Sequence, residues 1–174
     1  MAIIKKVLGK APKIHPSVFL AETAAITGDV TMAEGSSAFY GVSARGDSAA
    51  IAVGARSNLQ DNVVLHADEG IPCTIGEDVS IGHAAIVHGA TVGDGALIGM
   101  NATVLNGATV GAGSLVAANS MVPEGMDIPP KSLVAGVPAK IRRELTDEQS
   151  AGLKRNAEVY VRLATEHRNA EDVE

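Results

Sequence analysis

The stretch IGMNATVLNGATV, residues 98–110, carries an aliphatic side chain at every sixth position. This spacing continues without a break through Val92, Ile98, Val104, Val110, Val116, Val122, Ile128 and Val134. A period of six fits neither the 3.6-residue period of an α-helix nor the two-residue alternation of a strand. Hexapeptide repeats are typical of a parallel β-helix, a coil of short strands and turns, whereas an ordinary β-sandwich lacks such strict phasing. We therefore predict an all-β fold of this kind.

Shorter series with the same spacing precede the long one. They are Ile75, Ile81 and Val87; Val53, Leu59 and Leu65; and Ile14, Leu20, Ile26, Met32, Ala38 and Ala44. Three hexapeptides make one triangular coil of about 18 residues, so equivalent positions of successive coils stack on one another. The breaks between the series predict insertions between Ala44 and Val53 and within residues 67–74.

A helical pattern follows the repeat. Thr146 and Gln149 have the spacing of a capping box, in which each side chain bonds to the backbone of the other residue. Apolar residues then recur at helical intervals, at Leu153, Ala157, Tyr160, Val161 and Ala164. We predict a helix over about 147–168, and a chain made of a β-helix domain, 1–145, and a C-terminal helix and tail, 146–174, that packs on it.

Composition and charge limit the kind of protein. Aromatic residues make up only 2% of the chain, so Val, Ile, Leu and Ala must build the core. The net charge of −6 argues against a nucleic-acid partner.

The lone cysteine, Cys73, excludes an intramolecular disulfide, and residues 1–13 lack a signal-peptide pattern, so we expect a cytoplasmic protein. Residues 95–123 are uncharged, but Asn101, Asn106 and repeated glycines interrupt them, so we predict no membrane segment.

Two of the histidines fall on one corner of the predicted triangle. His66 follows Leu65 and His88 follows Val87, and these aliphatic residues occupy the same column in adjacent coils. Adjacent coils lie one strand spacing apart, ~4.8 Å, so the two imidazoles can share one metal ion. Arg45 falls beneath His66 in the next coil.

A third histidine, His83, lies one corner back. Several extended residues separate it from His88, which places it roughly 10 Å or more from the pair. A three-fold trimer would bring His83 of one subunit beside His66 and His88 of the next. Three neutral imidazoles and a water form the open tetrahedral arrangement of catalytic zinc.

At these residues the sequence resembles the γ-class carbonic anhydrases, the metal-dependent branch of the left-handed β-helix proteins. The resemblance covers nearly the whole chain. Its specific motifs are Arg45-Gly46-Asp47, Asn58-Leu59-Gln60-Asp61, Leu65-His66, Ile81-Gly82-His83 and Val87-His88. It implies a left-handed coil, a homotrimer, and the reversible hydration of CO2 to bicarbonate by a metal-bound hydroxide.

The resemblance also implies roles for individual residues. The implied metal ligands are His66, His83 and His88, with His83 donated by the neighbouring subunit. The implied ion is Zn2+, although imidazole ligands also accept Fe2+ or Co2+.

Further residues are implied around the ion. Gln60 would orient the hydroxide and Asn58 would help to position substrate. Arg45 and Asp61 would form an ion pair across the trimer interface, with Asp47 in the same network. Holding the trimer together without chemistry is the alternative role for Arg45 and Asp61.

Proton transfer is where the sequence departs from the family. Ser48 stands where the best-studied branch carries a Glu directly after the Arg-x-Asp motif. Glu69 matches a second family Glu, in a shorter loop, and is otherwise a solvated carboxylate. Tyr160 resembles a family Tyr near the metal and also fits the apolar stripe of the helix; Arg162 replaces the Asn expected two residues later. Because Ser48 cannot export a proton, we expect hydration that is slow or dependent on buffer.

Three other functions stay open at this point. The same metal site would also suit a hydrolase that acts on a thioester or another small activated carbonyl. A hexapeptide acyltransferase would use one His as a general base without a metal. A trimeric scaffold would keep the metal for stability alone.

Overall fold

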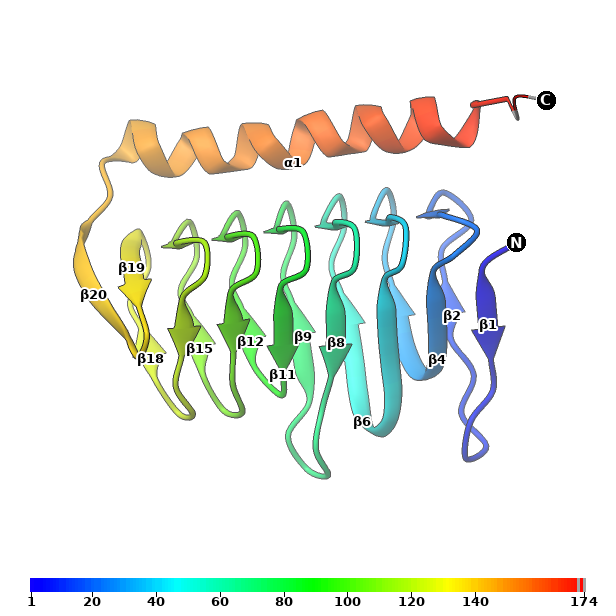
Figure 1. Cartoon of the computed structure of the whole chain (residues 1–174), viewed down its shortest axis with the longest axis horizontal. Coiled ribbons are helices and arrows are strands. Elements are labelled where there is room, and N and C mark those ends of the chain that lie inside the picture. The colour runs from blue at the N-terminus through cyan, green and yellow to red at the C-terminus, as the bar shows by residue number, and fades with distance from the viewer. Residues whose placement is uncertain (172, 174) are drawn as a thin grey trace.

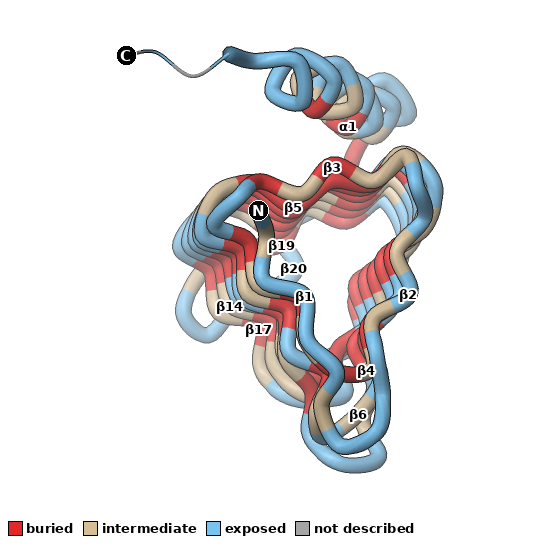
Figure 2. The backbone as a smooth tube through the Cα atoms, turned by 90° about the vertical axis from the view of Figure 1, so that its right-hand side faces the viewer, coloured by how far each residue is buried: buried red, intermediate tan, exposed pale blue. Residues whose placement is uncertain are grey.

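The computed structural model describes residues 1–171 and 173 and has the shape of a triangular coil with one long helix along its side (Figures 1 and 2). The predicted parallel β-helix is confirmed: equivalent strands of successive coils pair in parallel. The helix, α1 (Asp147–Arg168), covers the predicted range. Residues 172 and 174, at the end of the predicted tail, lie outside the described residues.

The strands form three faces, which we name by what lies on them. The helix face consists of β3 (Phe19–Leu20), β5 (Ser37–Ala38), β7 (Asn58–Leu59), β10 (Ser80–Ile81), β13 (Leu97–Ile98), β16 (Leu115–Val116) and β19 (Ser132–Gly136), with β20 (Ala139–Glu144) antiparallel to β19. The histidine face consists of β1 (Ile3–Lys5), the first parts of β4 (Ala25–Met32) and β6 (Ser43–Val53), β8 (Val64–His66), β11 (Ile86–His88), β14 (Thr103–Val104) and β17 (Met121–Val122). The third face consists of β2 (Lys13–Ile14), the second parts of β4 and β6, β9 (Cys73–Ile75), β12 (Thr91–Val92), β15 (Thr109–Val110) and β18 (Asp127–Ile128).

The core is a stack of aliphatic side chains inside the triangle. Residues of the six-residue series point inward, and Ile98, Val104 and Val110 are fully buried. Each series member lies beside its counterpart in the next coil, as Leu65 does beside Val87. Burial of apolar area at roughly 25 cal/mol per Å² drives the packing, and the parallel backbone ladder sets the register.

Both predicted insertions are present. The register between β4 and β6 shifts after Gly28, so that Val30 pairs with Ile51. Residues 67–72 form a loop between β8 and β9. Neither insertion disturbs the columns above it, because the coil resumes the same register on the other side.

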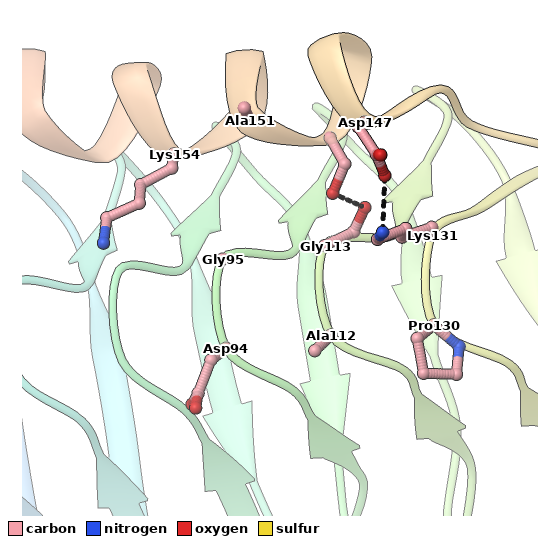
Figure 3. Close-up of a pocket in the computed structure, with 10 residues that line it drawn as sticks. Asp94, Gly95, Ala112, Gly113, Pro130, Lys131, Asp147, Ala151 and Lys154 are labelled. Atoms are coloured by element: carbon pink, nitrogen blue, oxygen red, sulfur yellow. Dashed lines mark hydrogen bonds and ion pairs between the residues drawn. The ribbon is translucent and has the colours of Figure 1, made fainter.

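Helix α1 begins at the predicted capping box, in which Thr146 Oγ1 accepts from the backbone N–H of Gln149 and Gln149 Oε1 accepts from Thr146 N–H. Its first turns are tied to the coil by Lys131 Nζ, 2.5 Å from Asp147 Oδ1, and by Ser150 Oγ, which donates to the Gly113 carbonyl at 3.0 Å (Figure 3). The helix then runs back over the helix face towards the first coils (Figure 1). No helix in the described part of the chain has the length and apolar character that a bilayer crossing demands.

Aromatic side chains join the far end of α1 to the first coils. Tyr160 meets Phe39 edge to face at 5.4 Å between ring centroids, and Phe39 packs on Phe19 at 5.3 Å. His167 lies over the same rings, and its Nδ1 is 3.0 Å from Tyr40 Oη. The few aromatic residues of the chain therefore pack this helix against the coil.

A carboxylate, Asp78, connects the middle of α1 to the coil. Arg56 donates to both of its oxygens, at 2.7 and 3.0 Å, and Lys154 of α1 lies 3.1 Å away. The Asp78 side chain is only 9% exposed. The hydrogen bonds from Arg56, opposed by burial and aided by Lys154, hold the pKa of Asp78 below its usual value of 3.8.

We predict that Asp78→Asn lowers the free energy of unfolding by about 1–2 kcal/mol at pH 7, because charge-assisted hydrogen bonds are lost. The folded-state pKa of Asp78 is depressed, so its contribution is present above the unfolded-state pKa and is lost as pH falls through the folded-state pKa. Urea unfolding at fixed protein concentration between pH 7 and pH 3 measures both effects. Glu77→Gln, at an exposed partner of Arg56, is the control and should have little effect. A difference between Asp78→Asn and wild type that stays constant with pH would contradict this account.

Candidate metal centre

His66 and His88 stack on one corner, as the repeat spacing predicts. They end the neighbouring parallel strands β8 and β11 and are paired in register. His66 Nδ1 lies 2.9 Å from His88 Nε2, and the ring centroids are 4.9 Å apart. Two imidazole nitrogens therefore face each other at the end of the histidine face.

The opposite nitrogen of each ring contacts an oxygen. His66 Nε2 is 3.0 Å from Asp47 Oδ1, and His88 Nδ1 is 2.7 Å from Asn106 Oδ1. Because a carboxylate or amide oxygen accepts, each of these nitrogens carries the ring proton. The two facing nitrogens are then left with lone pairs that converge without a proton between them. This arrangement fits a divalent transition-metal ion, whose histidine ligands commonly donate their other N–H to such a partner.

Asp47 is held in place by an unusually close approach of two strands. Gly28 of β4 pairs with Gly46 of β6, and a Cβ at Gly46 would lie 2.5 Å from the carbonyl oxygen of Asp29. Only glycine allows this contact. The close approach of the two strands sets the position of Asp47, which follows Gly46. Asp47 then accepts hydrogen bonds from Arg45 and from the backbone of Ser48.

The charge of Asp47 suits its contact with His66. Burial alone would raise the pKa of Asp47, but hydrogen bonds from Arg45 and His66 outweigh it and lower the pKa to about 2. The group is therefore a carboxylate at neutral pH. It holds the Nε2 proton of His66 and leaves Nδ1 free to bind a metal.

His83 lies apart from this pair. It occupies the corner between β10 and β11, where the helix face meets the histidine face. Its Nδ1 is 2.8 Å from Asp61 Oδ2, and its Nε2 is 3.4 Å from the hydroxyl of Tyr160. Among the described residues, the group of close potential ligands around His66 and His88 does not include it. The His83 side chain is 43% exposed, so the imidazole is partly open to solvent.

A cavity of about 480 Å³ lies beside His83, between α1 and the helix face. Its walls are mostly apolar and include Leu97, Met100 and Leu115. Gln60 and Tyr160 provide polar groups at its edge. Burial, followed by the charge of Asp61, raises the pKa of Tyr160, so its hydroxyl stays protonated near neutral pH.

The amide of Gln60 is fixed by hydrogen bonds on both sides. Its Oε1 accepts from the backbone N–H of His83 at 3.2 Å, and its Nε2 donates to Asn58 Oδ1 at 3.2 Å. Asn58 is 1% exposed and donates to Ser80 Oγ at 3.0 Å. Asn58 therefore does not line the cavity itself. It acts on the cavity by holding the Gln60 amide in position.

The remaining predicted residues divide between the two corners. Arg45 contacts Asp47, near His66, whereas Asp61 contacts His83, so Arg45 and Asp61 are not paired within the chain. Glu69 lines a hollow of about 350 Å³ together with Leu8, Asp47 and Ser48. It therefore lies on the His66 side of the molecule.

Two residues near the histidines were missed in the sequence. Asn106 follows His88 by 18 residues, one coil, so the count that stacked His88 on His66 also points to it. Asp68 lies in the loop after His66, and its Oδ1 is 3.9 Å from His88 Nε2. Because this loop is an insertion, Asp68 has no position in the repeat, and the spacing contains no signal for it.

Comparisons with known proteins agree with the hexapeptide-repeat fold. The family profile described as bacterial transferase hexapeptide (six repeats) matches residues 72–104 and 89–124. A probable carbonic anhydrase of Methanocaldococcus jannaschii is 54% identical over 151 residues, 87% of this chain and 95% of that protein. The mitochondrial gamma carbonic anhydrase 2 of Arabidopsis thaliana is 39% identical over 94% of this chain, which spans 61% of that protein. A crystal structure described as a putative acetyltransferase from Bacillus cereus superimposes with a TM-score of 0.95 at 38% identity, covering 98% of this chain and 99% of that one.

Asn106→Ala should weaken metal binding by about 10–100-fold, because His88 loses the acceptor that keeps the proton on Nδ1. Equilibrium dialysis against Zn2+, with the metal quantified by mass spectrometry, measures the change. Glu124→Gln is the control: Glu124 is an exposed carboxylate one coil beyond Asn106 at the same corner, and its loss should leave binding unchanged. Equal affinity of Asn106→Ala and wild type would contradict the role given to this contact.

Proposed function

Because this chain belongs to the γ-class carbonic anhydrase family of hexapeptide-repeat proteins, we propose that it catalyses the reversible hydration of CO2 to bicarbonate at a metal site shared between subunits of a homotrimer. The observation that carries the proposal is the divided histidine set. Two imidazoles with converging lone pairs occupy one corner, and a third, partly exposed imidazole occupies another.

The ligands in this proposal are His66 Nδ1 and His88 Nε2 of one subunit and Nε2 of His83 of the partner subunit. Each has its other nitrogen bonded to an oxygen, namely of Asp47, Asn106 and Asp61 respectively. A divalent ion held by these three imidazoles would lower the pKa of a bound water to about 7 and so supply a nucleophile near neutral pH.

Pairing between subunits also accounts for the separated charges. Arg45 and Asp61 lie at different corners of one chain, and both side chains reach solvent. The corner that carries Arg45 would meet the corner that carries Asp61 in a cyclic trimer, since each subunit presents one corner to each neighbour. We infer that they form the intersubunit ion pair that the family resemblance implies, and that Asp47 joins Arg45 in this network.

The residues around His83 would position and enclose the substrate. Gln60, held by Asn58, presents a fixed amide beside His83 for a hydrogen bond to the attacking oxygen. The apolar walls of the adjoining cavity suit CO2, which is itself apolar. The Tyr160 hydroxyl, which is neutral near pH 7, lies 3.4 Å from the same Nε2 of His83, so it would give up this contact when an ion binds there.

Proton export depends on few groups in this chain. Ser48 has no titration near neutral pH, and it lines the hollow that also contains Glu69. Glu69 is therefore the one candidate shuttle that we assign on this side, and soluble buffer must carry the proton when Glu69 does not.

A hydrolase that acts on a small activated carbonyl, such as a thioester, is the second candidate. The size of the cavity beside His83, about 480 Å³, favours it, because CO2 fills only a small part of that volume. The same metal and ligands would serve both reactions. Acyl-CoA esters assayed in parallel with CO2 distinguish them.

We predict that metal-loaded protein hydrates CO2 and that the rate rises with buffer concentration, because proton export limits turnover.

His66→Ala should abolish metal binding and reduce activity at least about 100-fold while leaving the β-helix folded, because His66 lies outside the apolar core. Stopped-flow hydration, metal analysis and circular dichroism on the same samples measure these effects. Ser48→Glu should raise the rate at low buffer and weaken the buffer dependence.

Glu124→Gln serves as the control for expression and loading. Unchanged hydration in the metal-free protein, or in His66→Ala, would overturn the proposed function. A fast rate that ignores buffer would overturn only the account of proton export.

A further inference from the structure

The loop residue Asp68 completes a group of potential ligands within one chain. Its ligand atom lies within 4.8 Å of those of both His66 and His88. The nearest approach to His88 is 3.9 Å, from Asp68 Oδ1 to Nε2. Two ligands of a tetrahedral ion with bonds of about 2.0–2.1 Å are separated by roughly 3.4 Å. A small side-chain rotation therefore brings Asp68 into range, and its side chain, 55% exposed, is free to make it.

Asn106 aims Asp68 and His88 at the same point. Its Nδ2 donates to Asp68 Oδ2 at 2.7 Å, and its Oδ1 accepts from His88 Nδ1 at 2.7 Å. The Asn106 amide thus binds Asp68 Oδ2 and His88 Nδ1, the two atoms that face away from the proposed ion. Asp68 Oδ1 and His88 Nε2 are the atoms left over, and they face each other.

The backbone of the loop also fixes Asp68. Its carbonyl accepts from the N–H of Ile71 at 3.0 Å, which closes a four-residue turn. Gly70, at the third position of this turn, has a φ of +77°, a conformation that favours glycine. The carboxylate is therefore presented by an ordered turn that is inserted into the repeat directly after His66.

We propose that His66, Asp68 and His88 form a two-histidine, one-carboxylate site that binds a divalent first-row transition-metal ion within a single chain. The proposal rests on the metal of the proposed function and names Asp68 as the ligand that occupies the position of the partner's His83 before assembly. A carboxylate neutralises part of the charge of the ion, and this donor set suits Fe2+ as well as Zn2+. The chain thereby holds an ion before His83 of the partner subunit is in place.

Assembly would then exchange one ligand for another. His83 of the partner subunit would take the position of Asp68, whose carboxylate would keep its hydrogen bond with Asn106. The exchange replaces an anionic ligand by a neutral one, which restores the full charge of the ion and the acidity of its bound water. No redox change or external reactant is needed.

The test compares Zn2+ and Co2+ binding in His83→Ala with and without Asp68→Asn, by equilibrium dialysis of the folded proteins. We expect His83→Ala to retain about one ion per chain, and His83→Ala/Asp68→Asn to bind at least about 10-fold more weakly. Asp68→Asn alone, with His83 intact, should bind within about 3-fold of wild type, because the three imidazoles remain. Glu124→Gln in the His83→Ala background is the matched carboxylate control and should change nothing.

Two results would overturn the inference while leaving the proposed function in place. One is a wild type that binds metal and a folded His83→Ala protein that binds none. The other is equal binding by His83→Ala with and without Asp68→Asn. Should the His83→Ala proteins fail to fold, His83→Gln replaces them, with the same expected contrast. Absence of metal binding in wild type would remove the proposed function itself.

Discussion

The structure depends on the parallel stacking of successive coils in register. The backbone ladder places each inward side chain on its counterpart in the next coil, and so also places the residue after it. His66 and His88 follow stacked aliphatic residues and are therefore held one above the other at a corner. The same register keeps His83 at a different corner, because it follows a strand of another face. A rigid coil thus creates half of a metal site and separates it from the remaining ligand.

Polar contacts around the three histidines determine which nitrogen of each ring is left to bind the proposed ion. Asp47, Asn106 and Asp61 each bind the nitrogen that faces away from the proposed ion. Helix α1, tied to the coil by Asp78 and by the aromatic cluster, forms one wall of the cavity beside His83 and carries Tyr160 to it. The packing of α1 on the coil therefore shapes the space in which substrate would react.

The elements set by periodicity were predictable from the sequence. The β-helix, both insertions, the stacked His66 and His88, and the capping box of α1 all follow from spacings that a regular structure repeats. Other features follow from side-chain directions that no spacing encodes. Asp68 lies in an insertion outside the repeat, and the burial of Asn58 becomes visible only once α1 covers its face. The division of Arg45 and Asp61 between two corners is a property of the chain, whereas their pairing is a property of an assembly.

The central claim is that one active site needs two chains, and subunit complementation tests it most directly. His83→Ala and His88→Ala chains, each inactive alone, are mixed in equal amounts, unfolded, refolded as trimers and assayed for CO2 hydration. Each interface of a random trimer has about one chance in four of combining an intact His83 with an intact His88 of its neighbour. The account predicts recovery of about a quarter of wild-type activity under equal refolding. Confirmed mixed trimers that remain inactive would contradict it.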